Sequence, residues 1–373
     1  MKICYLSNSA IGSYYASSIQ IVKMCEAFTK LGNDVVLISR KAENKKIKKQ
    51  NIFSYYDVKS KFTIKILKSF KTFPLGIKYY LFSIISIVES LKFRPNIYIT
   101  RNFFTCFLLV LFRKKIILEL HHDLSIESRT VKFLVKYFKF LNSKCIKKIV
   151  AITHSVKNTY IDNYRVNNEK ILVLPSGSSM KKNFIFKNNK KFFKIGYLGT
   201  LYESRGSNLI YNLAKIDKKN QYYLYGDLKK LKNYKKYDLI KNLNLYDWVP
   251  YKEISKILSK MDILLMPYVS SIKVAGDVGD ISKFTSPLKL FDYLTAGKII
   301  LCSDFHVLKE AIKDKQNAIF IKNYKNVFSW KSEIQKLKNQ PYKQLIISKN
   351  NHKLSKKYSL IQRAYKILNG INS

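Results

Sequence analysis

The chain has 373 residues, a length that predicts two or three domains, and its 47% hydrophobic and 14% aromatic content indicates a globular protein rather than a disordered one. Lys and Arg number 69 against 24 Asp and Glu, a formal charge of +45. The lysines are dispersed and no zinc-finger, helix-turn-helix or RNA-binding aromatic motif occurs, which argues against a specific nucleic-acid partner. The five cysteines form no C-x-x-C pair, so neither a disulfide framework nor a zinc site is expected.

The start of the sequence turns polar within a few residues, so we expect no signal peptide. The longest apolar runs, near residues 79–88 and 103–112, are too short to span a bilayer. These features and the cysteine usage predict a cytoplasmic location.

Strand-like and helix-length segments alternate through the first half of the chain. A helix is predicted over residues 17–31, and the predicted strands are residues 2–7, 34–39, 96–100, 116–120, 148–152 and 171–174. Strands that alternate with helices predict an α/β fold with a parallel sheet covered on both faces. We assign residues 1–180 to this first Rossmann-like domain.

A loop that contains Gly12 and Ser13 follows the first predicted strand and leads into the helix. Gly12 would allow a ligand to approach the start of that helix closely, and a plain tight turn is the alternative. The loop lacks the G-x-G-x-x-G pattern, so the sequence gives little support for a dinucleotide site.

Residues 59–92 interleave lysines with apolar side chains. The lysines are Lys61, Lys65, Lys68, Lys71 and Lys78, and the apolar side chains include Phe62, Ile66, Leu67, Phe70, Phe73 and residues 79–82. This mixture is typical of a helix that lies in the interface of an anionic membrane. A pair of helices packed on their own domain is the alternative.

A polar cluster ends the predicted strand 116–120. It consists of Glu119, His121, His122 and Asp123. Polar side chains at the carboxyl end of a parallel strand usually belong to a site rather than to a core. A lone histidine would more often be structural, but two carboxylates beside it favour a functional site.

The polar stretch 181–191 is predicted to be a linker, and the alternation restarts after it. The second set of predicted strands is residues 193–198, 222–225, 247–249, 263–266, 299–302 and 318–321. We assign residues 192–355 to a second Rossmann-like domain, and residues 356–373 to a helix that packs back on the first. The expected architecture is two doubly wound α/β domains with a cleft between them.

A helix with marked ends follows Phe284. Ser286 is predicted to be its N-cap, Pro287 its first residue, and Gly297 its stop. Lys289 then falls in the first turn, where the helix dipole disfavours a cation. A cation there is explained if an anion, most plausibly phosphate, binds at this terminus.

A second cation occupies the equivalent place in its own unit, because Arg205 opens the helix after the run Gly199-Thr-Leu-Tyr-Glu-Ser-Arg-Gly206. Arg205 and Lys289 together are predicted to clamp a diphosphate. Asp292 follows Lys289 by one turn, where a carboxylate could accept hydrogen bonds from sugar hydroxyls. A surface ion pair between Lys289 and Asp292 is the alternative.

The run from Gly199 to Gly206, the run Ser286-Pro-Leu-Lys-Leu-Phe-Asp-Tyr-Leu-Thr-Ala-Gly-Lys298 and the pair Ser303-Asp304 together resemble the C-terminal domain of glycosyltransferase family 4. Further segments resemble the same family: Ser18-Ile-Gln-Ile-Val-Lys-Met24, Phe28-Thr-Lys-Leu-Gly32, Ala151-Ile-Thr-His-Ser155 and Asp262-Ile-Leu-Leu-Met-Pro-Tyr268. The family consists of retaining, nucleotide-sugar-dependent enzymes with the GT-B fold, in which two Rossmann-like domains face each other across a cleft. The resemblance spans nearly the whole chain.

The resemblance implies a role for each matching residue. His121, Arg205 and Lys289 would be catalytic, the two cations acting on the donor diphosphate and His121 near the transferred sugar, with His122 as the other candidate histidine. Asp292 stands where the family's second glutamate binds ribose, and Phe284 replaces the first. The predicted substrate-binding residues are Gly12, Ser13, Glu119, His122, Thr200, Ser286, Pro287, Leu288 and Asp292.

The expected function is transfer of a sugar, with retention, from a nucleotide-diphosphate sugar to a glycan or lipid-linked acceptor. The basic, partly apolar first domain favours envelope polysaccharide or lipopolysaccharide synthesis in bacteria, at the inner face of the plasma membrane. The sequence contains no Asp-x-Asp motif, so we expect no metal and no other cofactor. The alternatives are a non-catalytic partner that only binds a nucleotide sugar, which Phe284 favours, and a nucleic-acid-binding protein.

Overall fold

The computed structural model describes residues 1–42, 52–67, 74–180, 192–231, 234–269 and 280–371. The chain forms two compact units, Met1–Ser176 with Leu360–Ser373, and Gly177–Ser359. The predicted domain boundaries at residues 180 and 355 differ from these limits by four residues each. The predicted linker 181–191 lies outside the described residues, as do Lys68, Phe70, Lys71 and Phe73 of the lysine-rich segment.

The first unit is built on a parallel sheet, which among the described residues has seven strands in the order β3-β2-β1-β4-β5-β6-β7. The strands are β1 (Lys2–Ile11), β2 (Asp34–Lys41), β3 (Thr63–Leu67), β4 (Ile97–Thr100), β5 (Ile116–Leu120), β6 (Ile146–Ala151) and β7 (Ile171–Val173). β4 and β5 are buried along their whole length. Burial on both faces explains why they read as continuous apolar runs.

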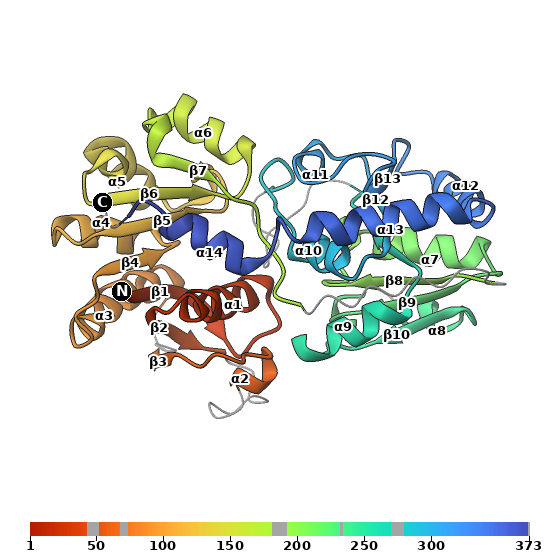
Figure 1. Ribbon diagram of the computed structural model, residues 1–373, viewed down its shortest axis with the longest axis horizontal. Helices are drawn as coiled ribbons and strands as arrows, with labels where there is room; N and C mark the ends of the chain where they lie inside the picture. Colours follow the sequence, from red (N-terminus) through yellow and green to blue (C-terminus); the bar gives the residue numbers. More distant parts are fainter. Residues whose placement is uncertain (43–51, 68–73, 181–191, 232–233, 270–279, 372–373) are drawn as a thin grey trace. The chain divides into compact units, whose positions relative to one another are not determined.

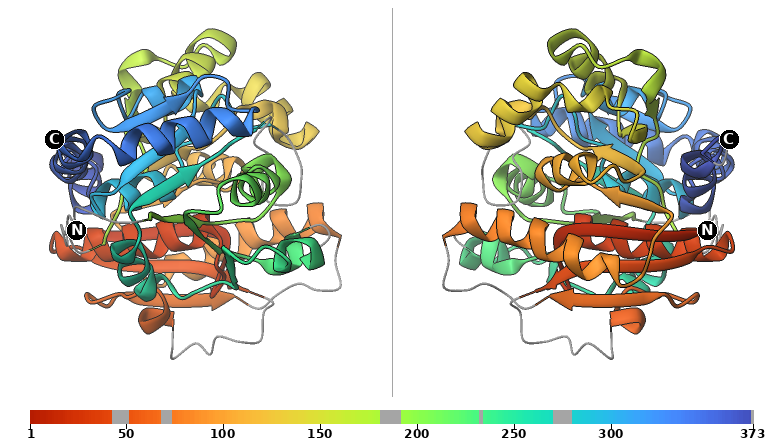
Figure 2. Two further views of the ribbon diagram at one scale, coloured as in Figure 1. Left: turned by 90° about the vertical axis from the view of Figure 1, so that its right-hand side faces the viewer. Right: turned by 90° about the vertical axis from the view of Figure 1, so that its left-hand side faces the viewer.

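Helices cover both faces of this sheet (Figures 1 and 2). They are α1 (Ala16–Lys30), α2 (Ile52–Tyr55), α3 (Leu75–Leu91), α4 (Phe103–Leu111), α5 (Arg129–Phe138), α6 (His154–Tyr164) and α14 (Leu360–Leu368). Side-chain caps fix several of their starts: Asn102, Ser128 and Thr153 accept hydrogen bonds from the first turns of α4, α5 and α6. α14, from the far end of the chain, packs on α1 (Figure 1).

The prediction of a single interfacial helix in residues 59–92 is wrong. Residues Thr63–Leu67 form β3, which pairs with β2 at the edge of the sheet, and the helix among the described residues of this segment is Leu75–Leu91. Lys65 lies in the strand and pairs with Glu89. Alternating lysine and isoleucine fit an edge strand with one solvated face, a pattern that resembles an amphipathic helix over a short stretch.

The second unit has a parallel sheet that, in the part of the chain described, contains six strands in the order β10-β9-β8-β11-β12-β13. They are β8 (Lys194–Leu198), β9 (Gln221–Tyr225), β10 (Leu243–Tyr246), β11 (Ile263–Met266), β12 (Ile299–Ser303) and β13 (Ala318–Ile321). Alternate residues enter different cores: Ile263 and Leu265 join one cluster, whereas Leu264 and Met266 join another. The strand predicted at 247–249 is wrong, because the strand of this region is Leu243–Tyr246.

The helices of the second unit are α7 (Ser207–Ile216), α8 (Tyr234–Asp238), α9 (Tyr251–Lys260), α10 (Leu288–Thr295), α11 (His306–Lys309), α12 (Val327–Lys338) and α13 (Pro341–Ser355). α10 begins one residue later than predicted. Pro287 is its N-cap and Leu288 its first residue, so Ser286 lies outside the helix and Lys289 is its second residue. Pro287 has an extended ψ of 125°, which places it before the helix rather than in it. Gly297 has a φ of 62° and ends the helix as predicted.

Candidate functional site

Each sheet reverses its strand order at one place, between β1 and β4 in the first unit and between β8 and β11 in the second. In open α/β sheets, ligands bind outside the carboxyl ends of the strands at this switch point. Gly199 follows β8, and Tyr268 and α10 follow β11. The predicted cations therefore lie at the switch point of the second unit.

Lys289 and Arg205 come together around two buried tyrosines. The Lys289 Nζ atom lies 3.9 Å from the ring centroid of Tyr197 and 6.0 Å from that of Tyr268. Arg205 Cζ lies 5.5 Å from the same Tyr268 centroid. Both rings are buried. The electron-rich faces of the two tyrosines hold both cations beside each other.

Lys289 Nζ is buried and, among the described residues, has no hydrogen-bond partner and no carboxylate within ion-pair distance. Burial, and secondly the charge of Arg205, hold the pKa of Lys289 well below its usual range. The predicted alternative, a surface ion pair with Asp292, is therefore wrong. A buried ammonium beside a guanidinium is a site that an anion would stabilise.

Two glycines make room for this arrangement. A Cβ atom on Gly199 would lie 2.7 Å from Lys289 Nζ, and the φ of Gly199 is +144°. A Cβ atom on Gly206 would lie 2.0 Å from the Pro267 carbonyl oxygen, at a φ of +86°. Only glycine fits at either position. Gly206 is also the N-cap of α7, and it directly follows the short 3-10 turn Glu203–Arg205. Its backbone conformation therefore fixes the position of Arg205 relative to α7.

The other predicted residues of this unit surround the pair. The Thr200 carbonyl oxygen accepts a hydrogen bond of 2.7 Å from the Tyr197 hydroxyl, which fixes the ring under Lys289. Ser286, Pro287 and Leu288 are half-buried and form the approach to the first turn of α10. Thr200 and Lys289 thus both contact Tyr197, the first at its hydroxyl and the second at its ring face.

Asp292 is 5% exposed and lies deeper than its predicted role suggests. Its Oδ1 atom accepts hydrogen bonds from Ser178 Oγ at 2.7 Å and from the Tyr251 hydroxyl at 3.0 Å. These contacts connect α10 to α9 and to the segment that enters the second unit. Asp292 therefore has a structural role beside its proposed role as a ribose ligand.

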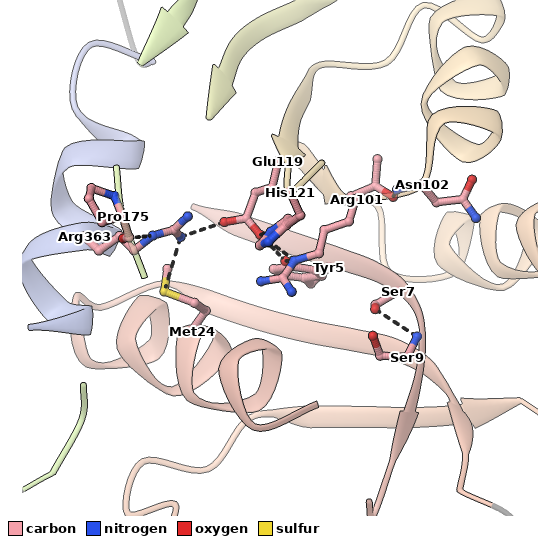
Figure 3. Close-up of polar contacts among 11 residues, drawn as sticks. Tyr5, Ser7, Ser9, Met24, Arg101, Asn102, Glu119, His121, Pro175 and Arg363 are labelled. Atoms are coloured by element: carbon pink, nitrogen blue, oxygen red, sulfur yellow. Dashed lines mark hydrogen bonds and ion pairs between the residues drawn. The ribbon is translucent and has the colours of Figure 1, made fainter. Parts of the chain in front are cut away.

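Glu119 is the centre of a buried charge cluster at the switch point of the first unit. Figure 3 shows Arg101, Tyr5 and Arg363 converging on its carboxylate, with His121 beside it. Oε2 accepts hydrogen bonds from the Tyr5 hydroxyl at 2.5 Å and from Arg101 Nε at 2.8 Å, and Oε1 accepts one from Arg363 Nη1 at 2.6 Å. These cations, with Arg363 first, hold the pKa of Glu119 well below its usual range against the effect of burial.

Glu119 lies deeper than its predicted role in substrate binding suggests. The side chain is 1% exposed and both carboxylate oxygens are engaged by residues of its own unit. Glu119 therefore has a structural role in this cluster, and its predicted role in substrate binding stays a prediction.

The two adjacent histidines face different surroundings. His121 Nε2 lies 3.8 Å from Glu119 Oε2, within the cluster. His122 Nε2 lies 3.4 Å from Glu127 Oε1, and its main-chain oxygen accepts a hydrogen bond from Tyr160. Burial, reinforced by Arg101, lowers the pKa of His121 to about 3, and burial lowers that of His122 to about 4. Both imidazoles are neutral near pH 7, and His121 is the one at the switch point.

Gly12 and Ser13 are buried and lie in the loop between β1 and α1. The Gly12 amide donates to the Tyr56 hydroxyl at 3.0 Å, and that hydroxyl donates to the Ser13 carbonyl at 2.7 Å. Ser13 Oγ is 2.9 Å from Ser18 Oγ. The φ of Gly12 is 95°, which explains the glycine. The loop is held from behind by Tyr56, and direct contact with donor phosphates remains a proposal.

Sequence reasoning missed Tyr197, Arg101 and Arg363. Arg101 follows the predicted strand 96–100 directly, so its position at a carboxyl end could have been noticed. Arg363 lies 244 residues from Glu119, and no local pattern indicates that contact. In the described part of the chain, no group of three or more His, Cys, Asp or Glu side chains is arranged to hold a metal ion.

Two parallel sheets with helices on both faces define a GT-B-type glycosyltransferase fold, which solved structures share. A HepE protein of Anabaena in complex with UDP-glucose aligns with a TM-score of 0.71 at 12% identity, over 100% of this chain and 99% of the other. A glycosyltransferase from Rickettsia africae aligns with a TM-score of 0.71 at 12% identity over 99% and 98%. WaaG, a glycosyltransferase involved in lipopolysaccharide biosynthesis, aligns with a TM-score of 0.64 at 14% identity over 99% of both chains.

The family follows from the sequence itself. Residues 179–354 match the family model described as Glycosyl transferases group 1, and residues 18–180 match the model described as Glycosyltransferase Family 4. The chain belongs to this family of glycosyltransferases. No curated protein matches it significantly.

Proposed function

We propose that this protein is a retaining glycosyltransferase that moves a sugar from a nucleotide-diphosphate sugar to a glycan or lipid-linked acceptor. The observation that carries the proposal is the pair of half-buried cations, Lys289 with its buried Nζ atom and Arg205, at the switch point of the second unit. A diphosphate seated there would receive both positive charges and the N-terminus of α10.

The chemistry follows from where charge develops. Breaking the bond between the sugar and the diphosphate leaves an oxocarbenium-like sugar and negative charge on the leaving phosphate oxygen. Lys289 and Arg205 would stabilise that charge in a site that is already assembled, which is the most effective form of electrostatic catalysis. The two cations take the part that a metal ion plays elsewhere, so donor binding is proposed to need no metal.

Retention is proposed to arise by attack of the acceptor on the face from which the diphosphate departs. A leaving-group oxygen then takes the proton of the acceptor hydroxyl, and no enzyme nucleophile is required. His121 would face the transferred sugar as a neutral imidazole, which can donate a hydrogen bond from one nitrogen and accept one at the other. Asp292, which also accepts hydrogen bonds from Ser178 and Tyr251, would contact the ribose hydroxyls with its carboxylate.

The donor is proposed to be a UDP-sugar, with HepE in complex with UDP-glucose as the supporting neighbour. The sugar itself is proposed to depend on Phe284. Phe284 is half-buried and stands where the resembling family has a carboxylate. A phenyl ring cannot accept a hydrogen bond from a sugar hydroxyl as that carboxylate would, so the preferred sugar should differ accordingly.

The acceptor is proposed to be a glycan or lipid-linked glycan at an anionic membrane surface, in envelope polysaccharide or lipopolysaccharide synthesis. The similarity of fold to WaaG supports the pathway. Among the described residues, no helix is long and apolar enough to cross a bilayer. Contact with the membrane would therefore depend on an exposed surface.

The first unit offers such a surface on α5 and the end of α4. Phe133, Tyr137 and Phe138 on α5 are 57%, 70% and 51% exposed, and Leu111 and Phe112 are 59% and 60% exposed. Phe107 contacts Phe138 at 5.2 Å between ring centroids, so the two helices are neighbours. Basic side chains accompany this apolar surface at Arg113, Lys114, Lys115, Arg129, Lys132, Lys136 and Lys139. Aromatic side chains among lysines favour the interface of an anionic membrane.

Turnover with a panel of UDP-, GDP-, ADP- and CMP-sugars tests the function, with nucleotide release and transfer to lipid-linked glycan as readouts. Proton NMR of the product gives the anomeric outcome, which we expect to be retained. Nucleotide binding without release or transfer would instead identify a non-catalytic member of the family.

Co-sedimentation with vesicles of phosphatidylglycerol, and separately of phosphatidylcholine, tests the surface. We expect binding to the anionic vesicles only, and loss of binding in Phe133→Ser/Tyr137→Ser. Phe328→Ser/Tyr342→Ser is the matched control, because Phe328 and Tyr342 are 64% and 75% exposed on the second unit. Equal binding by both double variants would rule out the α5 surface.

A further inference from the structure

Arg363 is the one charged side chain that α14 buries among the described residues of the first unit, at 4% exposure. Its neighbours on the helix show the contrast, since Tyr365 and Lys366 are exposed. Placing a guanidinium inside a unit costs free energy unless it is paired and fully bonded. Nε and Nη1 of Arg363 are bonded, whereas Nη2 is buried without a hydrogen-bond partner among the described residues. The bonded atoms indicate what α14 does.

Arg363 makes three contacts, one to each of three segments of the first unit. Nη1 donates to Glu119 Oε1 at 2.6 Å and lies 3.6 Å from Met24 Sδ on α1. Nε donates to the Pro175 carbonyl oxygen at 3.0 Å. The side chain thereby fixes one oxygen of Glu119 (Figure 3). The other oxygen, Oε2, accepts hydrogen bonds from the Tyr5 hydroxyl and from Arg101 Nε, and it lies 3.8 Å from His121 Nε2.

The protonation of His121 depends on its burial and on the charges of this cluster. Burial first, and then the charges of Arg101 and Arg363, lower the pKa of His121, whereas Glu119, 3.8 Å from its Nε2, raises it. The remaining groups at this place are the Tyr5 hydroxyl, which donates to Glu119, and His122, whose ring faces Glu127 instead. Two guanidinium groups against one carboxylate leave a net positive charge beside His121.

We infer that Arg363 is a positioning residue for His121, acting through Glu119: Arg363 on α14 holds one oxygen of the Glu119 carboxylate, and the other oxygen lies beside the His121 ring at the switch point. The role of His121 in transfer rests on the proposed function, but its protonation state does not. Through this ion pair, α14 contributes a side chain to the site in the first unit.

Titration of the five histidine rings by NMR, with His121 assigned from His121→Gln, tests the inference without any substrate. In the unchanged protein His121 should remain neutral from pH 8 down to pH 5. In Arg363→Met its protonation should begin at higher pH, because one of the two opposing charges is gone. Arg363→Lys should restore the behaviour in part, and Lys366→Met, which removes an exposed charge from the same helix, should change nothing.

Turnover provides the second readout. Arg363→Met should lose about 10- to 100-fold in turnover, as loss of orientation commonly does, with an unchanged thermal shift on adding UDP. Because that variant leaves Glu119 with fewer partners and could unfold, Glu119→Gln/Arg363→Met removes both charges and should show the same loss of turnover. A folded Arg363→Met with unchanged His121 titration, or a double variant with turnover within about twofold of the unchanged protein, would overturn the inference. If the unchanged protein turns over no donor, the proposed function fails and the titration still decides the role of Arg363.

Discussion

The ammonium group of Lys289 lies 3.9 Å from the ring centroid of Tyr197, and the hydroxyl of that ring donates to the Thr200 carbonyl in the loop after β8. This relationship connects a cation from one strand–helix unit to the loop of another. It holds Lys289 in place before any ligand arrives. A preorganised cation needs no rearrangement as charge develops in the transition state.

Lys289→Met and Arg205→Ala should each lower turnover by roughly 100-fold or more, as loss of a transition-state donor typically does. Steady-state kinetics with the best donor measures the effect. Lys256→Ala, which removes an exposed lysine from α9, is the control and should retain normal turnover. Near-normal turnover in either cation variant would remove the clamp from the mechanism.

At a pH between the depressed pKa of free Lys289 and its pKa in the complex, donor binding should take up a proton at Lys289. Burial and Arg205 depress the pKa of Lys289 in the free protein, and a bound diphosphate favours the ammonium form. Donor affinity is therefore highest below the depressed pKa of Lys289 in the free protein. It falls as the pH rises from there toward the pKa of Lys289 in the complex. Calorimetry in buffers of different ionisation enthalpy counts the protons. Lys289→Met should abolish the uptake, and equal uptake in that variant would place the titrating group elsewhere.

Gly199→Ala should weaken donor binding by displacing Lys289. The added Cβ atom would lie 2.7 Å from Lys289 Nζ at a φ that alanine rarely adopts. The expected result is a donor KM at least about tenfold higher, since small displacements of binding groups are costly. Gly76→Ala is the control, because its Cβ would meet no atom within 4 Å. An unchanged KM in Gly199→Ala would mean that donor binding does not depend on the position of Lys289 over the Tyr197 ring.

Asp292→Asn should reduce stability as well as donor affinity. The carboxylate accepts hydrogen bonds from Ser178 and Tyr251, and hydrogen bonds to a charged acceptor contribute about 1.5–3 kcal/mol each. Urea unfolding measures the first effect. Comparison of UDP with 2′-deoxy-UDP isolates the second, because a ribose ligand loses its advantage when the hydroxyl is absent. Equal losses for both nucleotides would leave Asp292 with its structural role alone.

Most of the fold can be predicted from the sequence, because buried parallel strands such as Ile116–Leu120 and Ile263–Met266 are apolar throughout and stand between turn residues. β3 was missed because an edge strand buries only one face, so Thr63 and Lys65 alternate with Ile64 and Ile66. The strand Leu243–Tyr246 was displaced to 247–249 for a related reason: alternating Asn and Leu indicate a strand less clearly than Trp248 and Val249 do.

The site was predictable where one segment carries both the structural signal and the chemistry. Lys289 was found because a cation at a helix start conflicts with the helix dipole. The environment of a residue is set by distant segments and is not visible locally. Glu119 therefore looked like a ligand-binding carboxylate, whereas in the structure its carboxylate forms an ion pair with Arg363, which lies 244 residues further along the chain. Asp292 likewise gave no sign that Ser178 would bind it.

Lys289 and Arg205 are proposed to bind the diphosphate of the donor. Calorimetric titration of UDP, GDP and ADP, each beside its parent nucleoside, into the unchanged protein and into Lys289→Met tests this proposal without requiring turnover. We predict that one diphosphate binds the unchanged protein far more tightly than its nucleoside does, and that Lys289→Met loses most of this difference while its affinity for the nucleoside is unchanged. Equal affinity of Lys289→Met and the unchanged protein for that diphosphate would contradict the account.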